Sequence, residues 1–181
     1  VIRLGLFYVC TLYLRVIRLL FRAPITGDTN YLATPLFTIK RILTHACVHP
    51  SGPFVDIGCG EGLVGVCVRL IQRMPVILHD TQSHFLVWIR RLARVLWIPR
   101  IHCEGPVRAS YANTSTFFCC WTSWSVQNRR DMVATLSRVV PAGAHLITVS
   151  HGMKHPEWIE VAHITESFAW GRASVYYYKH A

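Results

Sequence analysis

The chain has 181 residues, which suits one domain that is large enough to bury a substantial core. Its 19 lysines and arginines outnumber nine acidic residues and give a net charge of +10, which favours an anionic partner such as nucleic acid, acidic lipid or an acidic protein surface. A basic surface without a dedicated partner is the alternative. The sequence contains no linker, repeat or low-complexity tract that would divide it.

The first 22 residues predict an amphipathic helix. On a helical projection Arg3, Arg15, Arg18 and Arg22 fall within an arc of about 120°. Such a helix either lies on an anionic membrane surface or packs its apolar face on the domain, and we favour packing. The segment lacks the cleavage site of a secretory signal, and its longest uncharged run is too short to span a bilayer. The chain begins with Val rather than Met, which leaves open whether residues precede it.

Beyond this helix, strand-like and helix-like runs alternate. Strands are expected over 52–58, 75–80, 98–105, 115–121, 145–150 and, as a hairpin, 158–179; helices are expected over 36–43, 62–74, 83–96 and 126–140. Alternation of this kind predicts a doubly wound α/β fold with a mostly parallel seven-stranded sheet and a C-terminal antiparallel hairpin. We therefore divide the chain into an N-terminal helical segment, 1–52, and a sheet domain, 53–181.

The seven cysteines and ten histidines are scattered along the chain. No two cysteines show the C-x-x-C spacing, their number is odd, and several lie inside apolar runs. This pattern indicates buried thiols in a reducing, intracellular compartment, and it argues against a disulfide framework or a metal site.

The first expected strand leads into a glycine-rich turn, "FVDIGCGEG" (54–62). In a doubly wound sheet the first strand-to-helix turn contributes to the ligand site. Gly58, Gly60 and Gly62 have the spacing G-x-G-x-G and follow Asp56, whereas a dinucleotide-binding turn has G-x-G-x-x-G. A carboxylate beside this turn repels pyrophosphate and attracts a cationic ligand. The turn therefore predicts a ligand with positive charge.

"FVDIGCGEG" resembles the first motif of class I S-adenosylmethionine-dependent methyltransferases, whose cofactor is a cationic sulfonium. The resemblance implies a Rossmann-like fold with S-adenosylmethionine as cofactor. It also implies that Asp80, at the end of the second strand, binds the ribose hydroxyls, and that the neighbouring Thr81 contacts the cofactor as well. The loop residues that the resemblance assigns to the cofactor are Asp56, Ile57, Gly58, Cys59, Gly60 and Gly62. An ordinary turn with a surface aspartate is the alternative reading.

A narrower resemblance joins "YLATPLFTIKRIL" (31–43), the apolar N-terminal helix and the closing "SFAWGRASVYYYK" (167–179). Together they are similar to membrane-associated protein-lysine methyltransferases of the ATP synthase c-subunit type. In that family a Tyr-x-x-Thr-Pro-like segment caps the cofactor, which implies this role for Tyr31 and Thr34. The alternative is that Thr34 is only the N-cap, and Pro35 the first-turn proline, of the next helix.

The third strand departs from the methyltransferase pattern. Family members usually end this strand in Gly-Asp, and the acid meets the adenine amino group; here "CEGPV" (103–107) has Glu104 and Gly105 followed by proline. Glu104 or the backbone at Gly105 is expected to replace that contact. Residues 105–115 are short and polar for a crossover helix, which predicts an open adenine side.

The fourth strand ends in "CCWTSW" (119–124) and lacks the Asn-Pro-Pro-Tyr-like tetrad of amino-methylating enzymes. We expect Trp121 or Trp124 to form an aromatic wall for a cationic or planar acceptor. Trp121 is also expected near the cofactor, and Thr122 or Ser123 would place a hydroxyl near the nucleophile. Core packing, with a serine as N-cap of the following helix, is the alternative.

These features predict an S-adenosylmethionine-dependent methyltransferase, with a protein lysine near a membrane as the leading acceptor. A small-molecule or lipid methyltransferase is one alternative, and a cofactor-binding module without catalysis is another. Nucleic acid also stays open as a partner. No residue stands out as a general base, and His79 is only a remote candidate.

Overall fold

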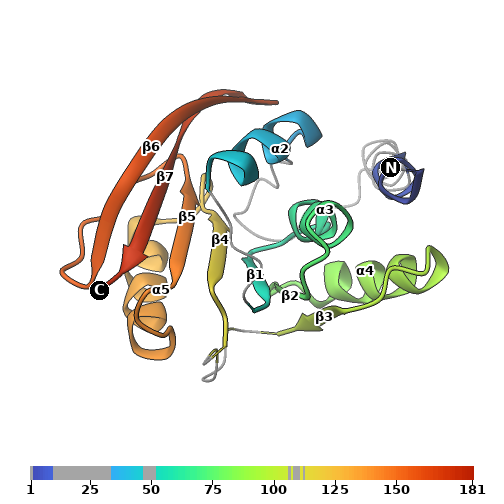
Figure 1. Cartoon of the computed structure of the whole chain (residues 1–181), viewed down its shortest axis with the longest axis horizontal. Helices are drawn as coiled ribbons and strands as arrows, with labels where there is room; N and C mark the ends of the chain where they lie inside the picture. Colours follow the sequence, from blue (N-terminus) through green and yellow to red (C-terminus); the bar gives the residue numbers. More distant parts are fainter. Residues whose placement is uncertain (1, 10–33, 47–51, 106, 108–110, 112) are drawn as a thin grey trace.

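The structure is a computed structural model that describes residues 2–9, 34–46, 52–105, 107, 111 and 113–181. Seven strands form one sheet in the order β3-β2-β1-β4-β5-β7-β6 (Figure 1). The strands are β1 Phe54–Ile57, β2 Val76–His79, β3 Ile101–Glu104, β4 Thr116–Cys120, β5 His145–Val149, β6 Trp158–Phe168 and β7 Gly171–His180. The first five pair in parallel, and β7 lies antiparallel between β5 and β6. The expected doubly wound sheet with a terminal hairpin is confirmed.

The named helices are α2 Leu36–His45, α3 Leu63–Ile71, α4 Ser83–Val95 and α5 Val126–Val139, and residues 2–9 are also helical. They cover the sheet unequally. α2, α3, α4 and the helical stretch 2–9 contribute to one apolar cluster on one face, whereas α5 packs on the other face (Figure 1). Among the described residues between β3 and β4 (105, 107, 111 and 113–115), none is helical, which agrees with the short, polar character of this connection.

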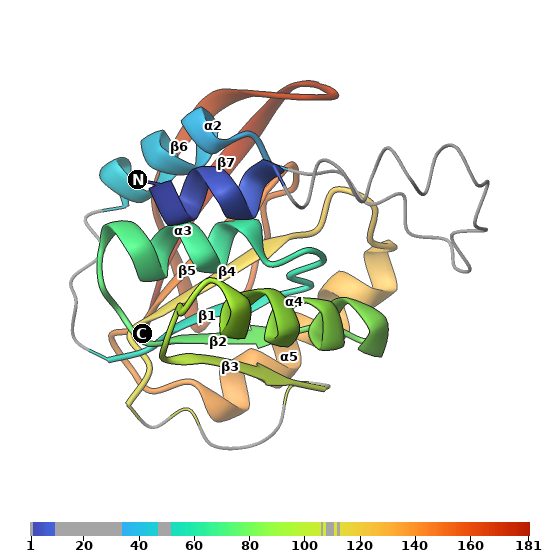
Figure 2. The ribbon, with the colours of Figure 1, turned by 90° about the vertical axis from the view of Figure 1, so that its right-hand side faces the viewer.

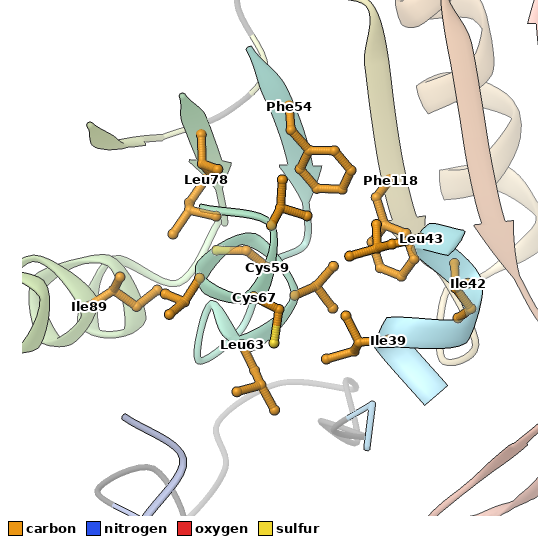
Figure 3. Close-up of a cluster of buried hydrophobic side chains, with 14 of the residues drawn as sticks. Ile39, Ile42, Leu43, Phe54, Cys59, Leu63, Cys67, Leu78, Ile89 and Phe118 are labelled. Atoms are coloured by element: carbon orange, nitrogen blue, oxygen red, sulfur yellow. The ribbon is translucent and has the colours of Figure 1, made fainter. Parts of the chain in front are cut away.

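The apolar cluster shared by α2, α3, α4 and residues 2–9 is the larger of the two, and it fixes the helices that follow β1 and β2. α3 is buried throughout its first two turns because α2 and α4 flank it, and Figure 3 shows Ile39 of α2 and Ile89 of α4 on either side of Leu63 and Cys67. α4 buries one stripe and exposes its arginines, as its apolar and basic faces predict. The start of each helix is thereby held beside the end of the preceding strand.

The described part of the N-terminal helix packs on the domain. Phe7 is fully buried in the larger cluster, and Leu4 and Tyr8 pack against it. Arg3 donates from Nη1 to the main-chain oxygen of Trp97 at 2.9 Å. The other predicted arginines, at positions 15, 18 and 22, lie outside the described residues. No helix within the described ranges is both long and apolar enough to cross a membrane.

Candidate cofactor and acceptor site

The glycine turn folds back over the end of β2. The main-chain N–H groups of Gly58 and Cys59 both donate to the oxygen of His79, at 2.9 and 3.0 Å. Gly58, Gly60 and Gly62 have φ values of 69°, 51° and 74°, a region that residues with a Cβ rarely adopt. Glycine therefore favours this shape of the turn, which presents bare main chain to its surroundings.

A cleft of about 860 Å³ opens at the carboxyl ends of β1, β2 and β4, where the strand order reverses. A parallel doubly wound sheet binds its ligands at this position. Many of the residues that the sequence assigned to the cofactor or to the acceptor line the cleft, namely Thr34, Asp56, Ile57, Gly58, Cys59, Gly60, Asp80, Thr81, Gly105 and Thr122.

Three other assigned residues lie elsewhere. Gly62 serves packing, because a Cβ there would lie 2.8 Å from Cδ1 of Ile89. The Glu104 side chain is 47% exposed and does not line the cleft. Trp121 is 0% exposed, and its Nε1 donates to the oxygen of His151 at 2.9 Å. Tyr31 lies outside the described residues, so its role as a cap stays a prediction.

Thr34 does not act as the N-cap of α2. That position belongs to Pro35, which offers no side-chain cap. Thr34 is buried and lines the cleft, and its role as a cofactor cap stays a prediction.

The carboxylate of Asp80 links the glycine turn to the start of α4 by hydrogen bonds. Its Oδ2 accepts a hydrogen bond from the N–H of Gly60, and its Oδ1 accepts one from the N–H of Gln82, both at 2.8 Å. The side chain is only half-buried and lines the cleft. A carboxylate offers about four acceptor positions, so two remain for hydroxyl groups of a ligand. The sequence pointed to Asp80 but not to its bond with Gly60.

Asp56 is a buried acid beneath the turn. Its Oδ2 accepts a hydrogen bond from the N–H of Gly65 at 3.1 Å. Burial raises the pKa of Asp56 to about 7; the hydrogen bond from Gly65 opposes this shift, and the charge of Asp80 adds to it. A cation bound in the cleft would favour the ionised form of Asp56. Two neighbouring carboxyl groups thus make this side of the cleft suitable for a positively charged ligand.

Where the resemblance places the adenine, His79 holds the connection that follows β3. Its Nδ1 lies 2.8 Å from the oxygen of Gly105 and, because a carbonyl only accepts, must donate. In the neutral ring Nε2 then accepts from the hydroxyl of Tyr111, at 2.5 Å. Both ring nitrogens are therefore engaged, and His79 is poorly placed to act as a general base. Gly105 and Val107 contribute the wall here.

The opposite wall is built from the segment after β4 and from α5. Trp124 lines the cleft, and a Cβ on Gly58 would lie 3.1 Å from its Cζ2. Trp124 therefore supplies the aromatic wall that Trp121 does not. Thr122 also faces the cleft, with its Oγ1 2.7 Å from Oγ of Ser150. Ser125 is the N-cap of α5 and accepts a hydrogen bond from the N–H of Asn128. A serine N-cap for this helix was one of the two interpretations of the segment.

α5 contributes residues to the cleft that the sequence did not reveal. Asn128, Asp131, Met132 and Thr135 all line the cleft. Their spacing of three and four residues places them on one face of the helix. The sequence shows this spacing, but it does not show whether this face of α5 points into the cleft, because that depends on how α5 packs on the sheet.

Comparisons with known proteins identify the fold. No family model matches the sequence, and no curated protein matches it. An RNA methyltransferase from Salinibacter ruber, in complex with S-adenosyl-L-homocysteine, has a TM-score of 0.67 at 13% identity, over 82% of this chain and 94% of that one. TrmN from Thermus thermophilus has a TM-score of 0.69 at 12% identity, over 91% of this chain and 53% of TrmN, so this chain spans about half of TrmN. Geranyl diphosphate C-methyltransferase from Streptomyces coelicolor has a TM-score of 0.63 at 12% identity, over 80% of this chain and 77% of that one. The chain has the class I methyltransferase fold.

Of the sequence motifs expected for the class I methyltransferase fold, this chain keeps those after β1 and β2 and lacks those after β3 and β4. The glycine turn and Asp80 occupy the positions at which the resemblance places the cofactor's methionine part and ribose. The acid expected after β3 is replaced by an exposed Glu104, and no Asn-Pro-Pro-Tyr-like tetrad follows β4.

Proposed function

We propose that the protein is an S-adenosylmethionine-dependent methyltransferase. The observation that carries this proposal is Asp80, which holds the N–H of Gly60 at 2.8 Å and still faces a cleft of about 860 Å³. The Salinibacter ruber and Streptomyces coelicolor structures of the same fold contain S-adenosyl-L-homocysteine. The residues present fit such a ligand, because the turn offers bare main chain and the carboxyl groups of Asp56 and Asp80 both line the cleft, where they would attract a sulfonium and accept hydrogen bonds from ribose hydroxyls.

Each part of the cleft then has a task. Bound there, S-adenosylmethionine would supply an electrophilic methyl group on a sulfonium centre. The main chain at Gly58 and Gly60 would hold the methionine part, and Asp80 the ribose. Trp124 and Thr122 would hold the acceptor in line with the methyl group and exclude water, which is the main contribution that a protein makes to this reaction.

For the acceptor, we place a protein lysine first. The ring of Trp124 at the cleft attracts a cationic side chain, and Asp131 on α5 adds a negative charge to the same wall. The narrower family resemblance supports the same acceptor near a membrane, and the cysteine pattern favours a reducing compartment. The amine must lose its proton before attack, and desolvation against an aromatic wall lowers the pKa of a lysine.

RNA is the second candidate acceptor. The net charge of +10 suits a polyanion, and the Salinibacter ruber and Bacillus subtilis neighbours are named as RNA and tRNA methyltransferases. A small molecule is the third, since other neighbours are named as geranyl diphosphate methyltransferases.

Calorimetry tests the cofactor. S-adenosylmethionine and S-adenosyl-L-homocysteine should each bind and raise the melting temperature. Absence of heat with both compounds at high concentration would refute the proposal.

Radiolabelled S-adenosylmethionine then tests the acceptor. The protein is incubated with labelled cofactor and a cell extract, and protein, RNA and organic fractions are separated. Label in protein that yields methyl-lysine on hydrolysis supports the first candidate, and label in RNA or in the organic fraction supports the second or third. Cofactor binding without label in any fraction would indicate a non-catalytic module. Asp80→Asn serves as the control that should reduce labelling in every fraction.

A further inference from the structure

The end of the sheet opposite the cleft exposes large apolar side chains. Trp97 is 79% exposed, Val95 71%, Ile2 79% and Ile71 51%. They come from the end of α4, the end of α3 and the start of the helical stretch 2–9, and Figure 2 shows these three ends on the same side of the molecule. The bond from Arg3 to the oxygen of Trp97 joins two of them. Single exposed apolar residues are common, whereas a group that includes tryptophan indicates an interaction site.

Arginines surround these apolar residues. Besides Arg3, they are Arg69, Arg73, Arg94 and Arg100, and we call the nine residues together the Trp97 patch. Arg69 donates to the oxygen of Pro99 at 2.7 Å and to that of Arg73 at 2.6 Å. Burial and the neighbouring charges of Arg100 and Arg73 lower the pKa of Arg69, so these cations repel one another. The sequence has no acidic residue within 1–9, 62–79 or 81–103, from which the patch is built.

The backbone at the patch is strained where it presents these side chains. Arg73, Trp97 and Arg100 have φ values of 61°, 50° and 61°, in the left-handed region. Arg73 and Trp97 directly follow the C-caps of α3 and α4, a position at which glycine is strongly preferred because a Cβ is disfavoured there. Each long side chain thus occupies a position where glycine would be more stable. A side chain that carries such a cost is a candidate for a function of its own.

We infer that the Trp97 patch docks on a membrane surface that contains anionic phospholipid. Tryptophan is enriched at the interface between lipid and water, and arginine is attracted to acidic headgroups. Val95, Ile71 and Ile2 favour lipid over RNA, because single-stranded RNA is held by aromatic stacking and cations, and exposed aliphatic side chains add nothing to either. Docking by this end would leave the cleft, at the opposite end of the sheet, facing water. The inference does not depend on the proposed function.

Vesicle flotation with the full chain tests this surface. The protein should float with phosphatidylcholine vesicles that contain phosphatidylserine at low salt, and flotation should fade as salt screens the charges. Equal flotation with phosphatidylcholine alone, or none with either vesicle, would overturn the inference.

Trp97→Gly separates docking from folding. Because glycine relieves the strain at φ 50°, this variant should keep or raise the melting temperature while vesicle partitioning falls by about tenfold or more. Val161→Ser is the matched control, since Val161 is an apolar residue of β6 that is 54% exposed and lies outside the patch. Its partitioning should match that of the parent. Equal partitioning of parent and Trp97→Gly would refute the role of the patch.

Two further measurements complete the test. Fluorescence anisotropy with a labelled RNA should show weaker binding than the anionic vesicles; tighter RNA binding that Trp97→Gly abolishes would assign the patch to nucleic acid instead. Calorimetry with S-adenosylmethionine should give the same affinity for Trp97→Gly and the parent, so a failure of the docking inference can be told from a failure of the proposed function.

Discussion

The two halves of the cleft are held together in different ways. On the side of β1 and β2, main-chain groups bond to one another and to carboxylates within residues 56–82, as in the bond from Gly60 to Asp80. On the side of β4, β5 and α5, side chains from distant segments meet, as Thr122 meets Ser150. A site made from main chain tolerates little change in sequence, because any added Cβ disturbs it. A site made from side chains can change its acceptor without changing the fold.

Gly60→Val should have the largest effect of all, on the side of β1 and β2 where we expect the cofactor. Gly60 has a φ of 51°, where a β-branched residue is strained, and its N–H bonds to Asp80. The side chain would also occupy the surface along which the cofactor is expected to lie. We expect binding of S-adenosylmethionine to fall by more than about a hundredfold in calorimetry.

Gly143→Val is the matched control for this change. Gly143 has a φ of 82° in a turn outside the cleft, and a Cβ there meets nothing within 4 Å. It should lose comparable stability from backbone strain while keeping the cofactor affinity of the parent. If both variants lost affinity equally, the loss would reflect general destabilisation and the comparison of the two halves would fail.

Asp56→Asn should change the pH dependence of stability. The pKa of Asp56 is raised from 3.8 to about 7, so between these values the folded state holds a proton that the unfolded state has lost. This group therefore destabilises the fold as pH rises from about 4 to about 7, by an amount on the order of 4 kcal/mol.

Asparagine keeps an acceptor for the N–H of Gly65 and removes the buried charge. Denaturant unfolding at about pH 5 and about pH 8 should show that the parent loses more stability than Asp56→Asn over this interval. At about pH 8 the variant should be the more stable protein, although its affinity for a sulfonium should be lower. Parallel pH profiles for the two proteins would show that Asp56 does not titrate in this range.

Most residues that the sequence assigned to the cofactor line the cleft, because the information that places them is local. The residues from Asp56 to Asp80 lie in one strand-helix-strand unit, and their spacing determines where the carboxyl ends of β1 and β2 meet. The other half depends on which way helices and rings turn in the packed protein. Trp121 and Trp124 are the same residue type three positions apart, yet the first is buried in the apolar cluster that includes residues of α5 and the second lines the cleft. The α5 face was missed for the same reason.

Asp80→Asn should weaken cofactor binding by about tenfold to a hundredfold, because charge-assisted hydrogen bonds to ribose hydroxyls contribute roughly 1.5 to 3 kcal/mol. It also leaves the N–H of Gly60 or of Gln82 without its carboxylate acceptor, so stability should fall by about 1 kcal/mol. Calorimetry with S-adenosylmethionine measures the first effect and denaturant unfolding the second.

Asp131→Asn makes the same chemical change on the α5 wall and is the control for Asp80→Asn. Asp131 is exposed and accepts a hydrogen bond from Gln127 at 2.8 Å. Its substitution should leave cofactor affinity within about twofold of the parent. An equal loss in both variants would mean that the cofactor contacts both halves of the cleft.

The smallest effect is expected for the hydrogen bond between Thr122 and Ser150, whose hydroxyl oxygens lie 2.7 Å apart. It joins the residues after β4 to the end of β5, and Ser150 has a left-handed φ of 77° that must be held by its surroundings. Thr122→Ala and Ser150→Ala should each cost about 1 kcal/mol of stability, and the double variant should cost less than the sum because the shared bond is lost only once. Cofactor affinity should stay within about twofold of the parent in all three, while methyl transfer falls because the acceptor wall loosens. Additive stability losses would show that the shared hydrogen bond contributes nothing to stability, whereas a drop in cofactor affinity equal to that of Asp80→Asn would show that the cofactor depends on both halves of the cleft.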